Sequence, residues 1–294
     1  MTGNSPLTHS RRRSVALWVI AFVCVLAAAS WQRMTGPSHP LGGSIEFSGR
    51  QVDYDLIRSE NSDRDAIVQI GHEPAIKAAT LHYRRHGTSD TFSREAMSLT
   101  DENWAAALPQ QPAAGKLDYF LTLDSADQQS RIPADSTRFV VIRFKDPVPA
   151  LVLIPHILMM FVSMLCGLRA GLAALFEAGA GRRMVWVTLF CLTVGGLFLG
   201  PIVQKYAFGA YWTGWPVGED LTDTKTLVMW AGWAFAAGLV GRSGRIAGRA
   251  RAAMVIATVL MLGVYIVPHS VRGSTLDYEM LDEGVQPEDA VRTG

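Results

Sequence analysis

Residues 150–168 read ALVLIPHILMMFVSMLCGL, an apolar stretch that no carboxylate, lysine or arginine interrupts. An α-helix rises about 1.5 Å per residue, so about 20 such residues cross the hydrocarbon core of a bilayer. Three further apolar runs follow at residues 184–203, 227–240 and 252–268. The pattern therefore predicts a four-helix transmembrane module over residues 150–268.

Another apolar run, residues 14–30, follows three consecutive arginines at 11–13. It has the basic flank of a secretory signal peptide, and the alanines at 27–29 would supply a small-residue cleavage site. A retained transmembrane anchor is the other interpretation. The predicted membrane α-helical bundle thus has about five transmembrane helices, or four if the first is cleaved. Either way, the segment that follows is carried across the membrane.

The arginines predict the direction in which these helices cross. Two of them, at 182–183, separate the first two runs of the module, and four more lie between the last two. The loop 204–226 instead carries more acidic than basic residues. The positive-inside rule then places residues 1–13, a basic N-terminus, in the cytoplasm. Residues 31–149 and the tail 269–294 are predicted to be periplasmic, in a multi-pass protein of the bacterial inner membrane.

Residues 31–149 have a different pattern, in which apolar side chains alternate with polar ones. Leu117, Tyr119, Leu121 and Leu123 are two residues apart, which is the period of a half-buried β-strand. About eight such runs, separated by turn residues, predict an antiparallel β-sandwich. The other predicted strands lie at residues 44–48, 52–57, 66–70, 79–84, 92–98, 104–108 and 139–144.

Several aromatic residues in this segment carry a resemblance to a known fold. The quoted features are LHYRR at 81–85, then Phe92, Met97, Trp104, LP at 108–109 and LDYF at 117–120. This layout resembles an immunoglobulin-like or fibronectin-III-like domain, which implies a binding or spacer role and no chemistry. The helical module, with WTGWP at 212–216 and PHS at 268–270, resembles bacterial integral membrane proteins of uncharacterised activity.

Two histidines lie near the predicted outer ends of helices, His156 in IPHI and His269 in VPHS. Ionisable residues at membrane depth are functional candidates by default. Two helical histidines that face each other across a bundle can bind the iron of haem b as axial ligands. His156 and His269 are therefore the predicted cofactor-binding residues.

Copper is the alternative cofactor. Met159 and Met160 follow His156 by about one helical turn, and their soft thioether ligands suit copper. The outer loop contributes Asp220 and Asp223 as alternative metal ligands or proton-handling groups. A quinone or substrate pocket at the same end of the bundle is a further interpretation.

A purely structural interpretation explains the same residues. Asp220, Thr222 and Asp223 directly precede an apolar run, where acidic and hydroxyl side chains cap a helix N-terminus. An imidazole near the membrane interface reaches water or a carbonyl at little cost. The proline before each histidine then marks a helix boundary or a kink.

Net charge and the motifs present argue against two classes of function. The chain has 27 basic and 26 acidic residues and a net charge of +1, which argues against a nucleic-acid-binding protein. No catalytic motif is present in the sequence, so an enzyme is not favoured. The predicted function is binding or assembly of a periplasmic or membrane protein partner, in contact with membrane lipids. The alternative is a redox or metal-handling membrane protein.

Overall fold

A computed structural model describes residues 6–100, 102–177, 179–242, 246–267 and 273–292 of the chain. The chain divides into two compact units. The helical unit comprises residues 1–35, 148–204 and 211–272. The β unit comprises residues 36–147, 205–210 and 273–294.

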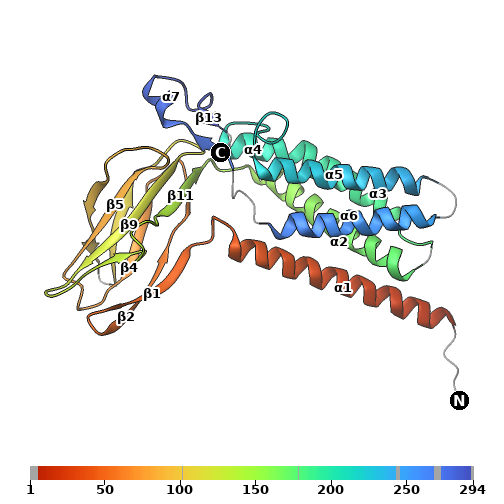
Figure 1. Ribbon diagram of the computed structural model, residues 1–294, viewed down its shortest axis with the longest axis horizontal. Helices are drawn as coiled ribbons and strands as arrows, with labels where there is room; N and C mark the ends of the chain where they lie inside the picture. Colours follow the sequence, from red (N-terminus) through yellow and green to blue (C-terminus); the bar gives the residue numbers. More distant parts are fainter. Residues whose placement is uncertain (1–5, 101, 178, 243–245, 268–272, 293–294) are drawn as a thin grey trace, which may run out of the picture. The chain divides into compact units, whose positions relative to one another are not determined.

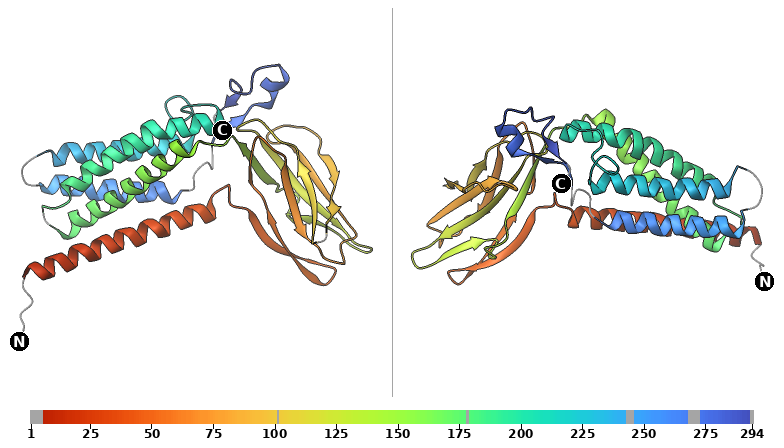
Figure 2. Two further views of the ribbon diagram at one scale, coloured as in Figure 1. Left: turned by 180° about the vertical axis from the view of Figure 1, so that it is seen from behind. Right: turned by 45° about the horizontal axis from the view of Figure 1, so that its top comes forward.

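Long helices run beside one another in the helical unit, as the views in Figures 1 and 2 agree. Their bounds are α1 Pro6–Thr35, α2 Ala150–Phe176, α3 Arg182–Cys191, α4 Gly200–Phe208, α5 Leu221–Val240 and α6 Gly248–Ile266. A π-helix, η1 (Leu192–Leu199), joins α3 to α4 without a break. The last residues of α4, from 205 onward, belong to the β unit.

Four stretches in the described part of the chain are long and apolar enough to cross a membrane. They are Arg11–Thr35, Ala150–Phe176, Arg182–Phe208 and Gly248–Ile266. Each contains most or all of one predicted apolar run. The remaining predicted run, 227–240, lies within α5, whose first turns carry Asp223 and Lys225 and which is not among these four.

Small residues allow the helices of this unit to approach closely. A Cβ atom added at Gly167 would lie 2.8 Å from the sulfur of Met261, and one added at Gly171 would collide with Thr258. Both contacts join α2 to α6, because Thr258 and Met261 lie on α6. The spacing of Gly167 and Gly171, four residues apart on one helix face, is the small-residue pattern of membrane helix packing.

The β unit contains strands at each of the predicted positions and several shorter ones. Their bounds are β1 Leu41–Phe47, β2 Arg50–Leu56, β3 Ser59–Asn61, β4 Ala66–Gly71, β5 Ala78–Arg85, β6 Ser93–Ala96, β7 Ser98–Leu99, β8 Asn103–Leu108, β9 Lys116–Asp124, β10 Gln129–Ile132 and β11 Val140–Lys145. The largest sheet has the order β3-β11-β9-β5-β6, and β10 also pairs with β9. A second sheet has the order β4-β8-β7, and β1 and β2 form a hairpin.

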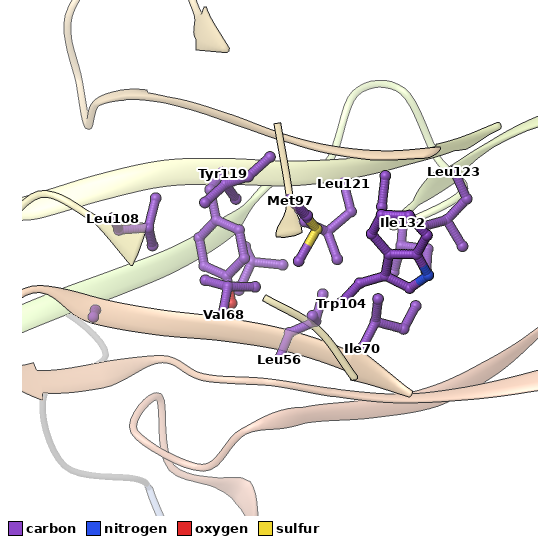
Figure 3. Close-up of a cluster of buried hydrophobic side chains, with 14 of the residues drawn as sticks. Leu56, Val68, Ile70, Met97, Trp104, Leu108, Tyr119, Leu121, Leu123 and Ile132 are labelled. Atoms are coloured by element: carbon purple, nitrogen blue, oxygen red, sulfur yellow. The ribbon is translucent and has the colours of Figure 1, made fainter. Parts of the chain in front are cut away.

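One apolar core unites these sheets. Figure 3 shows side chains of the second sheet, such as Val68 and Trp104, facing Tyr119 and Leu121 of the largest sheet. Leu117, Tyr119, Leu121 and Leu123 are all buried, which confirms the alternation read along this strand. The hydroxyl of Tyr119 donates a hydrogen bond to the carbonyl oxygen of Ile57 at 2.7 Å. A hydrogen bond of this kind allows the hydroxyl of a tyrosine to be buried in an apolar core.

The C-terminal segment is part of the β unit and is folded. It forms β12 (Thr275–Leu276), α7 (Tyr278–Asp282) and β13 (Val291–Arg292), with β12 and β13 paired antiparallel. Buried Tyr278 anchors it, because its hydroxyl accepts a hydrogen bond from the backbone N–H of Lys116 at 3.0 Å. Burial raises the pKa of Tyr278 to about 12. Arg85 adds an ion pair to Asp282 at 2.8 Å.

Candidate functional site

His156 lies in the second turn of α2 and contacts the π-helix η1. Its Nδ1 is 2.8 Å from the carbonyl oxygen of Gly195. The same carbonyl accepts the backbone N–H of Gly200, five residues further along, which is the bond that defines the π-helical turn. The His156 side chain of α2 therefore forms a hydrogen bond with the irregular backbone of η1.

This contact determines the tautomer of the imidazole. A carbonyl oxygen only accepts, so Nδ1 of His156 must carry the proton in this hydrogen bond. In the neutral ring Nε2 is then the unprotonated nitrogen and can accept a proton or a metal ion. Histidine ligands of metals are commonly oriented in this way, through a carbonyl bonded to the opposite nitrogen.

Met159 and Met160 lie at the same contact between α2 and η1. A Cβ atom added at Gly195 would be 2.6 Å from Cβ of Met159, and one added at Gly196 would be 3.7 Å from the sulfur of Met160. The two glycines let the helices touch, and the methionine side chains fill the remaining space. This packing role requires no metal.

Two aspartates at the start of α5 accept hydrogen bonds from protein donors. Asp220 caps α5 by accepting the backbone N–H of Thr222 at 2.7 Å. Asp223 is buried, and its Oδ2 accepts the backbone N–H groups of Thr213 at 2.7 Å and Gly214 at 3.1 Å. Both carboxylates satisfy backbone donors of the loop and helix start, as the structural interpretation of these residues expects.

The predicted metal ligands lie at two places in the described part of the helical unit. Within the described ranges, no group of three His, Cys, Asp or Glu side chains comes together in a metal-binding arrangement. His269 lies outside the described residues, so its pairing with His156 is left as a prediction. Of the predicted site, the structure brings His156, Met159 and Met160 to one helix contact and places Asp220 at the N-cap and Asp223 in the first turn of α5.

A second set of residues, which the sequence reading did not single out as a site, lies on the β unit. Phe92, Phe120 and Phe139 gather on the side of the largest sheet opposite the core. The ring centroid of Phe92 is 5.1 Å from that of Phe120 and 5.2 Å from that of Phe139. We call this set, together with His82, Arg84 and Arg131, the aromatic face.

Basic side chains are layered onto these rings. The guanidinium carbon of Arg84 lies 4.6 Å from the ring centroid of Phe92, and that of Arg131 lies 4.2 Å from the centroid of Phe120. His82 stacks on Phe120 with ring centroids 4.4 Å apart. Cation–π contacts of this kind hold cationic groups in place over apolar surface.

Basic side chains lie close to His82 in the aromatic face. The pKa of His82 lies below its ordinary value because of burial first, and then because of the nearby charges of Arg94 and Arg131, which a smaller opposing effect of Asp124 does not cancel. Arg94 is exposed on β6 and directly opposite His82 in the strand register. The nearby carboxylate of Asp118 is buried, 2.5 Å from Nδ1 of His86 and 3.5 Å from Nε of Arg84, so it compensates part of the charge of Arg84.

The alternation of side chains along β9 could have identified one residue of the aromatic face from the sequence. Along β9 the core residues are Tyr119 and Leu121, so Phe120 between them must point to the opposite side. A large aromatic residue at an outward position is the feature that could have drawn attention to it. Phe92 and Phe139 lie just before β6 and β11, at the first positions of the predicted strands 92–98 and 139–144. Alternation within each strand does not show that the two rings meet Phe120.

Other histidines of the β unit differ in their surroundings. His72 is exposed, whereas His82 and His86 are half-buried, and the partners of these two are Thr122 and Asp118. No protein-family model matches the sequence, and no curated protein matches it.

Proposed function

We propose that the protein is a multi-pass inner-membrane protein whose periplasmic β-sandwich binds an acidic segment of a partner protein through the aromatic face. The observation that carries the proposal is the stack of Phe92, Phe120 and Phe139 with Arg84 and Arg131 on the non-core side of a sheet. The proposal has three parts, which concern the fold, the membrane and the partner.

Strand order supports the assignment of the β unit to an immunoglobulin-like or fibronectin-III-like sandwich. The pairing β4-β8-β7 corresponds to the B-E-D order of such domains, and β5-β9-β11 corresponds to C-F-G. Packing of β2 beside β4 would supply strand A to the first sheet. The shared core between the sheets is the other feature expected of a sandwich.

The connections between the two units support five membrane-spanning segments, with α5 as the fifth beside the four apolar stretches. Residue Ala207, at the end of α4, belongs to the β unit and accepts a hydrogen bond from the backbone N–H of Asp146 at 3.0 Å. The tail belongs there too, with the N–H of Leu276 donating to the carbonyl of Ala114 at 3.1 Å. Residues 211–272 therefore leave the β unit and return to it. A segment that starts and ends on the same side of the membrane must cross the membrane an even number of times. If α6 spans the membrane, α5 must therefore span it as well.

The arginines orient this arrangement. With the β unit outside, the turns at 177–181 and 241–247 lie on the cytoplasmic side, next to the basic residues that the positive-inside rule requires there. Retention of α1 as an anchor is part of the proposal. Its Ala21 and Val25 are buried in the core of the helical unit, and Ser14 bonds Arg169 of α2 at 3.0 Å.

The aromatic face suits an acidic partner. Aromatic and arginine side chains are the residues that most often dominate protein interfaces. The arginines near His82 favour carboxylates, which exposed Arg94 would meet at the rim of the apolar rings. An extended segment that carries acidic and apolar residues fits this combination.

Photo-crosslinking in intact cells tests the proposal. A photoreactive amino acid replaces Ala96, which is exposed and in register with Thr80 on the outward side of β5. The matched control replaces Gln69, an exposed residue of β4 in the other sheet. We expect a discrete adduct at 96 and none at 69, with an acidic segment in the partner peptide identified by mass spectrometry.

Charge reversal then tests the chemistry. The R94E substitution in the crosslinking background should reduce the adduct at 96 at least several-fold, whereas R50E, on the exposed β1–β2 hairpin, should not. Absence of an adduct at 96, or an adduct that R94E leaves unchanged, contradicts the proposal. A basic partner peptide contradicts it as well.

The tautomer of His156 supports a second candidate, binding of haem b or copper through Nε2. The visible spectrum and metal content of the purified full chain test it. We expect a Soret band or stoichiometric copper that H156A abolishes while the protein still inserts. A colourless, metal-free preparation from cells supplied with haem and copper rules this candidate out.

A further inference from the structure

An open pocket of about 990 Å³ lies in the helical unit at the start of α3. Its lining consists of Gly179, Gly181, Arg182, Arg183, Met184, Trp186, Val187, Phe190 and Arg242. All of these belong to α3, the residues just before it and the start of the segment that follows α5. No acidic side chain occurs among these described lining residues.

Three arginines form the polar end of this pocket. Arg182 and Arg183 begin α3, and Arg242 reaches it from the loop after α5. The guanidinium carbon of Arg242 lies 5.3 Å from the ring centroid of Trp186, whose indole N–H donates to the carbonyl of Gly241 at 3.2 Å. The tryptophan therefore fixes the loop that carries the third cation.

Apolar side chains form the rest of the wall. Arg183, Val187 and Phe190 are spaced four and three residues apart on α3, so they lie on one stripe of the helix. Val187 is 39 % exposed and Phe190 is 60 % exposed. On this stripe, the guanidinium group of Arg183 is therefore followed directly by exposed apolar side chains.

The start of α3 adds to the positive character of this end. Its N-cap residue is Gly181, which provides no side-chain hydrogen bond to the first N–H groups of the helix. Uncapped N–H groups at a helix start favour an anion. This contribution is secondary to the three arginines, which define the site.

We propose that this pocket binds an anionic phospholipid of the cytoplasmic leaflet, with its phosphate on Arg182, Arg183 and Arg242 and an acyl chain along Val187 and Phe190. The inference rests on the proposed membrane orientation, which places the start of α3 at the cytoplasmic surface. Basic pockets between helices on that side are suited to acidic headgroups.

The shape of the pocket favours a lipid over a soluble phosphate. A free anion would use the three guanidinium groups alone, whereas Val187 and Phe190 continue from them into the membrane-spanning part of α3, where acyl chains lie. A phospholipid satisfies both ends of the pocket at once. The adjacent rings and methyl groups therefore specify an amphiphile rather than a small ion.

Native mass spectrometry of the full chain in a mild maltoside detergent tests the proposal. Phosphatidylglycerol and phosphatidylcholine with identical acyl chains are added at equal concentration, and retained lipid is counted. Each arginine near an anionic surface contributes about fivefold in affinity. We therefore expect phosphatidylglycerol to be preferred roughly tenfold or more, and excess inorganic phosphate not to displace it.

Two matched variants isolate the pocket. R182Q/R183Q/R242Q should bind the two lipids about equally, whereas R12Q/R13Q/R249Q removes three exposed arginines predicted on the same side and should keep the preference. If the triple variant does not fold, R183Q/R242Q replaces it, because both side chains are exposed. V187S/F190S should weaken binding of phosphatidylglycerol but keep the order of the two lipids.

Three results overturn the inference. They are equal retention of the two lipids by the wild type, an unchanged preference in the variants of Arg182, Arg183 and Arg242, and displacement by inorganic phosphate. Alkaline carbonate extraction of cell membranes serves as the separate check on the proposed function. If the chain is extracted, the membrane assignment fails. If it stays in the membrane without discriminating between lipids, only the lipid site fails.

Discussion

His82 lies flat against Phe120, with their ring centroids 4.4 Å apart and an angle of 3° between the ring planes. The imidazole also bonds Thr122, with Nε2 at 3.0 Å from Oγ1. These contacts couple the stability of the largest sheet to the protonation of one histidine, because β5 carries His82 and its partners lie on β9.

Acidification should destabilise this sheet. Burial and the charges of Arg94 and Arg131 lower the pKa of folded His82 below the value of about 6.5 expected when unfolded. Between these two values the unfolded state binds more protons, so stability falls as the pH falls through 6.5. Hydrogen exchange of β5 and β9 peptides should be faster at pH 5.5 than at pH 7.5, after correction for intrinsic rates.

The variant H82Q isolates this effect, since it keeps a hydrogen-bonding side chain without a titrating group in this range. We expect the pH dependence of β5 exchange to shrink in H82Q and to persist in H72Q, whose histidine is exposed on the loop after β4. Equal pH dependence in wild type and H82Q would show that other groups control it.

Removal of one hydroxyl should loosen the C-terminal segment. Tyr278 is 4 % exposed, and its hydroxyl accepts the N–H of Lys116 at the start of β9. Y278F leaves that buried N–H without its partner, which costs about 1–3 kcal/mol. Limited proteolysis should cut the segment 273–292 sooner in Y278F than in wild type. E283Q, on an exposed carboxylate after α7, is the control and should be cut at the wild-type rate.

A buried ion pair should dominate the stability of the helical unit. Arg169 is buried in α2, and its Nη2 is 2.7 Å from Oε2 of Glu177. E177A leaves the guanidinium without its carboxylate, which costs about 3–5 kcal/mol in buried pairs. Replacing both partners, in R169M/E177M, should restore much of this loss, because no buried charge then remains.

Buried Cys191 reports on this unit. In a C24S/C166S background, its reaction with a fluorogenic maleimide during heating gives the unfolding transition. We expect the midpoint to fall strongly in E177A and to recover in R169M/E177M. A double variant no more stable than E177A would show that packing of the arginine stem, rather than its charge, is decisive.

Period and hydropathy predicted most of the architecture. Alternation located β4, β5, β8 and β9 within about one residue at each end, because one side of each strand is buried. The strands β3, β7 and β10 have two to four residues, which is too short for a period to be recognised. The π-helix η1 could not be predicted either, because it lies within a continuous apolar run. A π-turn changes the backbone hydrogen bonds and not the amino-acid composition.

Long-range contacts limited the prediction of sites. His156 was identified from its membrane depth, but its partner is a backbone carbonyl of residue 195, which composition does not reveal. The aromatic face joins Phe92, Phe120 and Phe139 across three separate segments. The lipid pocket was visible only as arginine-rich loops, because the packing of Trp186 beside Arg242 depends on how α3 and α5 meet.

The loop before α5 should depend on a single carboxylate. Asp223 accepts two backbone N–H groups, from Thr213 and Gly214, and both residues are buried. D223A leaves these donors unpaired at about 1–3 kcal/mol each, whereas D223N retains one oxygen acceptor and should lose less. Each 1.4 kcal/mol corresponds to about tenfold in an opening equilibrium.

Hydrogen exchange of a peptide spanning residues 211–220 measures this opening. We expect roughly tenfold or faster exchange at Thr213 and Gly214 in D223A, and a smaller increase in D223N. E219A is the matched control, because Glu219 is an exposed carboxylate in the same loop. Wild-type exchange in D223A would mean that the loop is held by its other contacts, such as the bond between Gln204 and Thr213 at 2.5 Å.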